Sequence, residues 1–280
     1  MTRSLVYGLV LAGGSSRRMY QDKAALLYAG APQLIRAGEL LQRHCAQVFV
    51  SARTDQQDEL RNRWPMIVDQ HTDLGPLAGI AAAQAKHLDV AWLVIACDQP
   101  LLNDASLKQL LEQRDPARPA TAFRSPLDHQ PEPLCALWEP ASAPLIRNAI
   151  AAGEFSPRQL LKTWDTLLID PSQPETLSNV NTPAEYQQAS ALLEAQSVAQ
   201  AVTLQLQYFA ILRERAGKRS EAITTTARTP TALYAELQQR YGFTLDSAQL
   251  KVAINNEFCD WQQKLKSGDV VTFIPPVAGG

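Results

Sequence analysis

Four stretches in the first hundred residues are apolar at almost every position, and they constrain the fold more than any other feature of the chain. These runs are residues 7–12, 46–51, 66–69 and 90–97. A strand with one solvated face alternates apolar and polar residues, whereas a continuous apolar run is typical of a strand covered on both faces. Helical patterns at residues 32–44, 75–87 and 105–114 separate or follow the runs. We therefore expect an α/β fold built from βαβ units around a mostly parallel sheet.

The pattern changes near residue 200. Residues 203–209 alternate as a half-buried strand does, 223–226 are strand-like, 231–241 are helical, and 251–255 and 270–274 form two further strands. The order ββαββ predicts a β-grasp, or ubiquitin-like, domain. We expect a first domain at residues 1–199, a second at 200–280, and a short join at 197–200. The helix before the join should begin at Pro183, with Thr182 as its N-cap and Glu185 at its third position, and end near residue 196.

Composition excludes several functional classes. The net charge of −2 and the pI of about 6.1 do not favour nucleic acid as a partner. No apolar run reaches the length of a membrane-spanning helix. The four cysteines form neither a C-x-x-C pair nor a disulfide framework, so free thiols in the cytoplasm are expected.

A possible phosphate-binding loop follows the first apolar run. Gly13 and Gly14 permit a tight turn, and their backbone N–H groups can point at phosphate oxygens. Arg17, Arg18 and Lys23 follow and can add charge-assisted contacts to a triphosphate. On spacing alone, a Gly-Gly turn followed by solvated basic residues explains the segment equally well. It matches neither a Walker A loop nor a G-x-G-x-x-G fingerprint.

Two acidic residues stand where predicted strands end. Asp98 follows the most apolar run, and Asp69 closes another run just before a glycine-rich segment at residues 74–79. Ligands of open parallel sheets bind beyond the carboxyl ends of the strands, and a carboxylate there can hold Mg²⁺. The alternative for Asp98 is a residue that turns the chain or caps the next helix.

Taken together, five motifs resemble those of a known family, the molybdenum cofactor guanylyltransferases. They are Leu-Ala-Gly-Gly at 11–14 with Arg-Met at 18–19, Asp-Lys at 22–23, Gly-Pro-Leu-Ala-Gly at 75–79, Cys-Asp-x-Pro at 97–100 and Asn-Val-Asn-Thr-Pro at 179–183. The resemblance covers residues 4 to about 195. It implies a Rossmann-like nucleotidyltransferase fold and transfer of GMP from Mg-GTP to molybdopterin that carries molybdenum.

The resemblance also implies site residues. Lys23 and Asp98 would be catalytic, with Asp98 binding Mg²⁺, and Asn179 and Asn181 would lie near the cofactor phosphate. The nucleotide would contact Leu11, Ala12, Gly13, Gly14, Arg18, Lys23, Ser51, Asp69 and Asp98. Related cytidylyltransferases tend to have Ala-Ala-Gly where this chain has Ala-Gly-Gly, which favours GTP over CTP. The chain departs from the family at Tyr20, usually Gly, and at Ser51, an Asn in some members.

The final residues form a second group with a possible chemical function. Pro275 and Pro276 end the last strand and favour an extended chain up to Gly279 and Gly280. A frayed tail could also end in glycine. Residues 202–280 resemble the small, sulfur-carrying subunit of molybdopterin synthase. The resemblance implies that a separate adenylyltransferase activates Gly280, that Gly280 becomes a thiocarboxylate, and that the large synthase subunit receives the sulfur.

Both resemblances lead to molybdenum cofactor synthesis, so we expect a chain that serves two steps of that process. Three alternatives remain. The first domain could be a cytidylyl- or sugar-phosphate nucleotidyltransferase. The second could be a thiamine-type sulfur carrier or a protein modifier joined to a degenerate first domain. If Tyr20 and Ser51 mark lost catalysis, the first domain would only bind its ligand.

Overall fold

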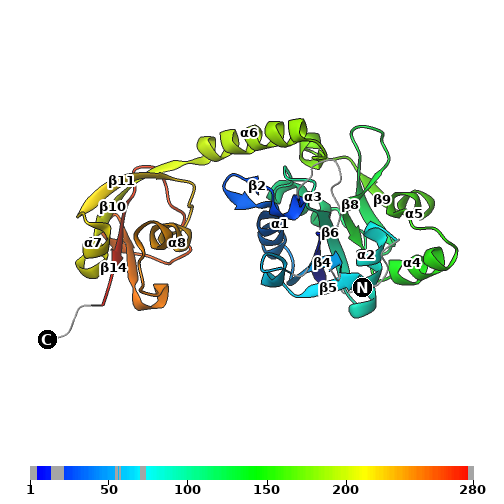
Figure 1. The fold of residues 1–280 in the computed structure, drawn as a ribbon, viewed down its shortest axis with the longest axis horizontal. Coiled ribbons are helices and arrows are strands. Elements are labelled where there is room, and N and C mark those ends of the chain that lie inside the picture. Colours follow the sequence, from blue (N-terminus) through cyan, green and yellow to red (C-terminus); the bar gives the residue numbers. More distant parts are fainter. Residues whose placement is uncertain (1–4, 14–21, 54–55, 57, 70–73, 277–280) are drawn as a thin grey trace. The chain divides into compact units, whose positions relative to one another are not determined.

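The computed structural model describes residues 5–13, 22–53, 56, 58–69, 74–276, with the side chains of 69 and 197–200 left aside. The chain divides into two compact units, Met1–Leu193 and Glu194–Gly280 (Figure 1). Helix α6 (Pro183–Gln200) crosses this division and ends four residues beyond the predicted end at 196. Its last turn contains alanine, valine and glutamine, which a helix tolerates, so the predicted join is helical. The boundary at 199/200 stays a prediction.

The first unit is built on a seven-stranded sheet with the order β5-β4-β1-β6-β8-β7-β9. The strands are β1 (Val6–Leu11), β4 (Gln47–Arg53), β5 (Met66–Asp69), β6 (Ala91–Ala96), β7 (Ala120–Arg124), β8 (Pro131–Trp138) and β9 (Leu167–Ile169). Strands β5, β4, β1 and β6 are mutually parallel, as expected. Strand β8 runs antiparallel to both β6 and β7, because a tight turn at residues 125–130 joins β7 and β8 as a hairpin.

Helices cover both faces of this sheet. They are α1 (Gln33–Gln42), α2 (Pro76–Lys86), α3 (Asp104–Glu112), α4 (Ser142–Ala151) and α5 (Pro157–Thr163). Short elements complete the unit: η1 (Lys23–Ala25), β2 (Leu27–Tyr28), β3 (Ala31–Pro32), η2 (Arg61–Arg63) and η3 (Pro174–Leu177). Within the described ranges, no helix combines the length and the apolarity that crossing a membrane requires.

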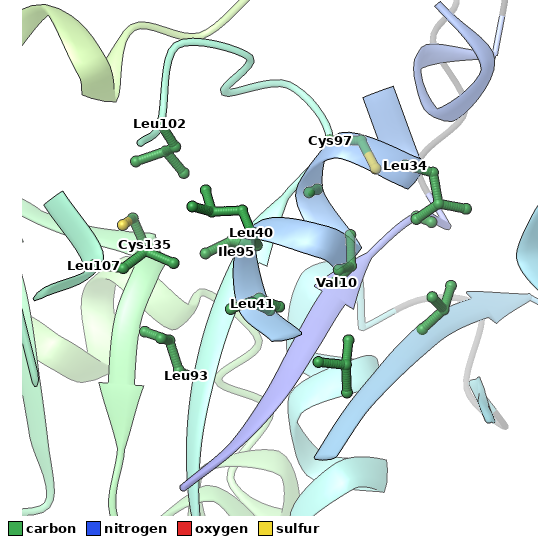
Figure 2. Packing of buried hydrophobic residues seen from close by; sticks show 14 of the residues in the cluster. Val10, Leu34, Leu40, Leu41, Leu93, Ile95, Cys97, Leu102, Leu107 and Cys135 are labelled. Atoms are coloured by element: carbon green, nitrogen blue, oxygen red, sulfur yellow. The ribbon is translucent and has the colours of Figure 1, made fainter. Parts of the chain in front are cut away.

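Successive residues of the central strands enter two different cores. Val10 of β1 joins a cluster with residues of α1 and α3, such as Leu41 and Leu107 (Figure 2). Its neighbour Leu9 joins the opposite cluster, with Leu77 of α2 and residues of α4 and α5. Side chains of a strand point alternately to opposite faces, so each face buries its own set of apolar residues. This explains why the runs are apolar at almost every position.

The second unit is a five-stranded mixed sheet with the order β11-β10-β14-β12-β13. Its elements are β10 (Val202–Tyr208), α7 (Ala210–Ala216), β11 (Ser220–Thr225), α8 (Pro230–Tyr241), η4 (Ser247–Gln249), β12 (Lys251–Ile254), β13 (Glu257–Phe258) and β14 (Val270–Ile274). Strands β10 and β14 are parallel, and the other pairs are antiparallel. Leu233 and Leu237 of α8 are fully buried in one core with Leu204, Leu206 and Phe273 of the sheet. The predicted β-grasp is confirmed.

Candidate active site

The strand order reverses between β1 and β6. From β1 the chain moves outward through β4 and β5, and it then returns to place β6 on the other side of β1. Such a point of reversal is where open α/β sheets bind ligands, beyond the carboxyl ends of the strands. Gly13 follows the end of β1 and Asp98 follows the end of β6. The backbone N–H of Cys97 donates to the carbonyl of Leu11 at 3.4 Å, which holds the carboxyl ends of β1 and β6 side by side.

Three of the predicted site residues meet beside this point of reversal. The Lys23 Nζ donates to Asn181 Oδ1 at 2.6 Å and lies 3.5 Å from Asp98 Oδ2. Lys23 comes from the short helix η1, Asp98 from the end of β6, and Asn181 from the segment that enters α6. The ammonium group is thus held between a carboxylate and an amide oxygen from distant parts of the sequence.

Local hydrogen bonds explain why Asn181 reaches this point. The N–H of Val180 donates to the carbonyl of Asp98 at 2.7 Å, which fixes the segment against β6. The predicted N-cap is confirmed. The N–H of Glu185 donates to Thr182 Oγ1 at 3.3 Å, and the N–H of Thr182 donates to Glu185 Oε2 at 2.9 Å, which together form a capping box. The N–H of Asn181 also donates to Glu185 Oε2, at 2.6 Å. This hydrogen bond makes the largest contribution to lowering the pKa of Glu185.

The carboxylate of Asp98 is partly buried, and one of its oxygens has no partner among the described residues. The side chain is 22% exposed, and that oxygen is the buried Oδ1. Burial raises the pKa of this carboxyl, and the nearby Lys23 opposes the shift only in part. A buried carboxylate oxygen without a partner is costly unless a ligand satisfies it. The residues therefore fit Mg²⁺, which commonly takes one or two protein carboxylates and fills its other positions with phosphate oxygens and water.

The raised pKa leads to a prediction about stability. A carboxyl group whose pKa is higher in the folded state contributes stability below its ordinary pKa, and that contribution is lost as the pH rises through the raised value. Asp98→Asn removes the charge, so the first unit should melt about 2–4 °C higher than the wild type at pH 8. The gain should vanish as the pH falls below the ordinary aspartate pKa of about 4. Thermal unfolding of both proteins across this pH range measures the difference. A melting temperature of Asp98→Asn below that of the wild type at pH 8 contradicts the prediction.

The first strand is packed closely against its neighbours at its carboxyl end. Leu11 pairs with Ser51 across β1 and β4, and the N–H of Ala12 donates to the Ser51 carbonyl at 2.9 Å. Ser51 is 1% exposed and lies under Gly79 of α2, where an added Cβ would collide with the serine hydroxyl. Glycine at 79 therefore lets α2 approach the sheet, a role that the sequence pattern did not indicate.

Several predicted site residues are not tested by this geometry. Gly14, Arg18 and Gly280 lie outside the described residues. Asp69 closes β5 as expected, but its side chain is outside the description, and Asn179 is exposed. Their roles, and the contact of Ser51 with a nucleotide, stay predictions.

Arg61 is a feature of this region that sequence reasoning missed. Its side chain is 1% exposed, and its guanidinium donates to the Ala12 carbonyl at 3.0 Å and to Asp22 Oδ2 at 2.7 Å. The arginine stands in the charged stretch 58–63, where side chains are usually solvated. No local pattern distinguishes a buried arginine there.

Comparison with known proteins agrees with this architecture. The model of the MobA-like NTP transferase domain matches residues 8–167, and that of the ThiS family matches residues 206–280. The chain is 35% identical over 189 residues to a molybdenum cofactor biosynthesis bifunctional protein of Synechocystis sp. That match covers 67% of this chain and 54% of the relative, so the chain spans about half of that relative's length.

One further relative and one solved structure each match about two thirds of the chain. A molybdenum cofactor guanylyltransferase of Xanthomonas euvesicatoria is 35% identical over 186 residues, which is 64% of this chain and 91% of the relative. The crystal structure of molybdopterin-guanine dinucleotide biosynthesis protein A from Archaeoglobus fulgidus has a TM-score of 0.58 at 23% identity. It covers 68% of this chain and 99% of that one, which shows a common fold. The chain belongs to the MobA-like NTP transferase family and carries a ThiS family domain behind the transferase domain.

Proposed function

We propose that the first unit transfers GMP from Mg-GTP to the terminal phosphate of molybdopterin carrying molybdenum. The observation that carries the proposal is the Lys23 ammonium group, which Asp98 and Asn181 hold at the point where the strand order reverses. Curated relatives named molybdenum cofactor guanylyltransferase supply the substrate class. Their names favour this assignment over a cytidylyl- or sugar-phosphate transferase.

The chemistry requires charge neutralisation more than proton transfer. A phosphate oxygen of the acceptor attacks the α-phosphorus of GTP, the bond to the bridging oxygen breaks, and pyrophosphate leaves with the bonding electrons. The attacking oxygen is already anionic, so no strong general base is needed. Bound Mg²⁺ would offset phosphate charge beside Asp98, and Lys23 offsets more of it from a fixed position. Asn181 and Asp98 orient the Lys23 ammonium group before the two polyanions meet.

For the second unit, we propose sulfur transport on the carboxylate of Gly280. A separate adenylyltransferase transfers AMP from ATP to the carboxylate of Gly280 and releases pyrophosphate. A donor of sulfur at the oxidation level of sulfide then attacks the acyl carbon, and AMP leaves to give a thiocarboxylate. The large subunit of molybdopterin synthase is the proposed acceptor. The ThiS family match through residue 280 supports the carrier role, and the relatives of the first unit favour molybdopterin over thiamine as the product. We assign both activities to the cytoplasm.

A nucleotide competition experiment tests the transferase assignment. The chain is incubated with molybdenum-loaded molybdopterin and Mg²⁺, with GTP or CTP as the donor. We expect kcat/KM for GTP to exceed that for CTP by about 100-fold or more, as in sites that hydrogen-bond the base edge. Equal or faster CMP transfer contradicts the assignment, as does GMP transfer only to a sugar phosphate.

A further inference from the structure

One buried arginine contacts both ends of the predicted phosphate-binding segment. Nη2 of Arg61 donates to the carbonyl of Ala12, before the segment, and to Oδ2 of Asp22, after it, at 3.0 and 2.7 Å. Nη1 donates to Asp58 Oδ2 at 2.5 Å, and the Asp58 Oδ1 accepts from the backbone N–H of Arg61 at 2.9 Å. Asp58 therefore holds the arginine in place, and the arginine holds residues 12 and 22 together.

Asp22 connects Arg61 to the lysine of the site. Its other oxygen, Oδ1, accepts from the N–H of Ala24 at 3.0 Å and so caps the helix η1, whose first residue is Lys23. The same carboxylate thus binds the guanidinium and fixes the turn that aims Lys23. A shift of Asp22 would move Lys23 relative to Asp98.

We propose that Arg61 is a positioning residue for GMP transfer, which acts through Asp22 to place the Lys23 ammonium group. The inference rests on the proposed transferase function. A planar guanidinium can serve the Ala12 carbonyl and two carboxylates at fixed angles, which a lysine ammonium on a flexible stem cannot do equally well.

Solvent exposure argues against a purely structural role. Arg61 is 1% exposed, but the side chains of Asp22 and Asp58 are 36% and 47% exposed. Both carboxylates would stay hydrated without the arginine, so they do not need it for solvation. Burying the guanidinium is itself unfavourable, and its hydrogen bonds offset that cost only with good geometry. What Arg61 contributes is a fixed distance between residues 12 and 22.

The test is a double-mutant cycle with Lys23. We expect Arg61→Met to lower kcat for GMP transfer about 100-fold, with a smaller change in KM for GTP, because a misplaced group costs mainly in the transition state. In a Lys23→Ala background the same change should cost less than about 3-fold, since residues acting as a unit are not additive. Arg61→Lys keeps the charge, so its kcat for GMP transfer should lie between those of the wild type and Arg61→Met.

Arg114→Met is the matched control. Arg114 forms a buried ion pair with Glu139 in the same unit, with side chains 3% and 1% exposed. Any loss of activity that it causes should be the same with and without Lys23. All assays are run below the lowest melting temperature of the set.

Asp22→Asn tests the same link if Arg61→Met does not fold. Asparagine can still cap η1, but it weakens the bond to Arg61. We expect about a 10-fold loss of kcat that disappears in the Lys23→Ala background. The proposal is overturned if either variant loses as much activity without Lys23 as with it. A wild-type chain that transfers no GMP would instead refute the transferase function, which separates the two failures.

Discussion

Replacing Asp98 with alanine is expected to lower GMP transfer by at least about 10³-fold and to leave sulfur loading of Gly280 unchanged. The carboxylate is the described group best placed to hold Mg²⁺, and its Oδ1 has no partner within the described part of the chain. Without it, the phosphates lose the metal position, and Lys23 loses one of the two groups that hold it. Because the chain divides into two compact units, the β-grasp should fold and load sulfur normally.

GMP transfer and thiocarboxylate formation are measured on the same preparation. Asp104→Ala serves as the control, because this aspartate of α3 is 58% exposed and pairs with Arg43 at the surface. It should keep transfer near the wild-type rate. An equal loss of both activities in Asp98→Ala would contradict the independence of the two units. Full transfer activity would contradict the assigned site.

One additional residue after Gly280 is expected to abolish adenylation of the chain. In the proposed carrier role, the activating enzyme takes the carboxylate of Gly280 through a narrow passage, which the two glycines would fit because they lack side chains. An extra residue removes that carboxylate from Gly280 and puts a side chain in the passage. AMP transfer from labelled ATP by a sulfur-carrier adenylyltransferase should fall to background, and GMP transfer by the first unit should stay at the wild-type rate.

A removable extension controls for damage to the carrier. If a protease cleaves the extension after Gly280, adenylation should return to the wild-type level. Normal adenylation of the uncleaved chain would show that the activated group is elsewhere and would refute the role of Gly280.

The sequence predicted the elements whose pattern is long and uniform. Strands β1 and β6 and the centre of β4 are largely apolar because neighbouring residues such as Leu9 and Val10 enter opposite cores. The start of α6 followed from Thr182 and Glu185, whose hydrogen bonds are local. Short elements without such a pattern were missed. Helix α7 occupies seven residues after β10 and ends at Gly217 in the left-handed conformation, and β13 has only two residues.

The site was predictable as a set of residues but not as an arrangement. Motifs indicated Lys23, Asp98 and Asn181 separately, whereas the contact between Lys23 and Asn181 joins positions 158 residues apart. Such a contact depends on the order of the strands in the sheet, which the pattern of residues along the sequence does not specify. The role of Arg61 was hidden for the same reason, because Ala12 and Asp22 lie 49 and 39 residues from it.

Intact-mass spectrometry of the full chain tests most directly the claim that one protein serves two steps of molybdenum cofactor synthesis. The wild type is incubated with a sulfur-carrier adenylyltransferase, ATP and a sulfur donor, and its C-terminal peptide is then sequenced. We predict a mass gain equal to replacement of one oxygen by sulfur, located on Gly280. No gain, with an enzyme that loads its own carrier in parallel, would contradict the claim and leave only the transferase unit with a function.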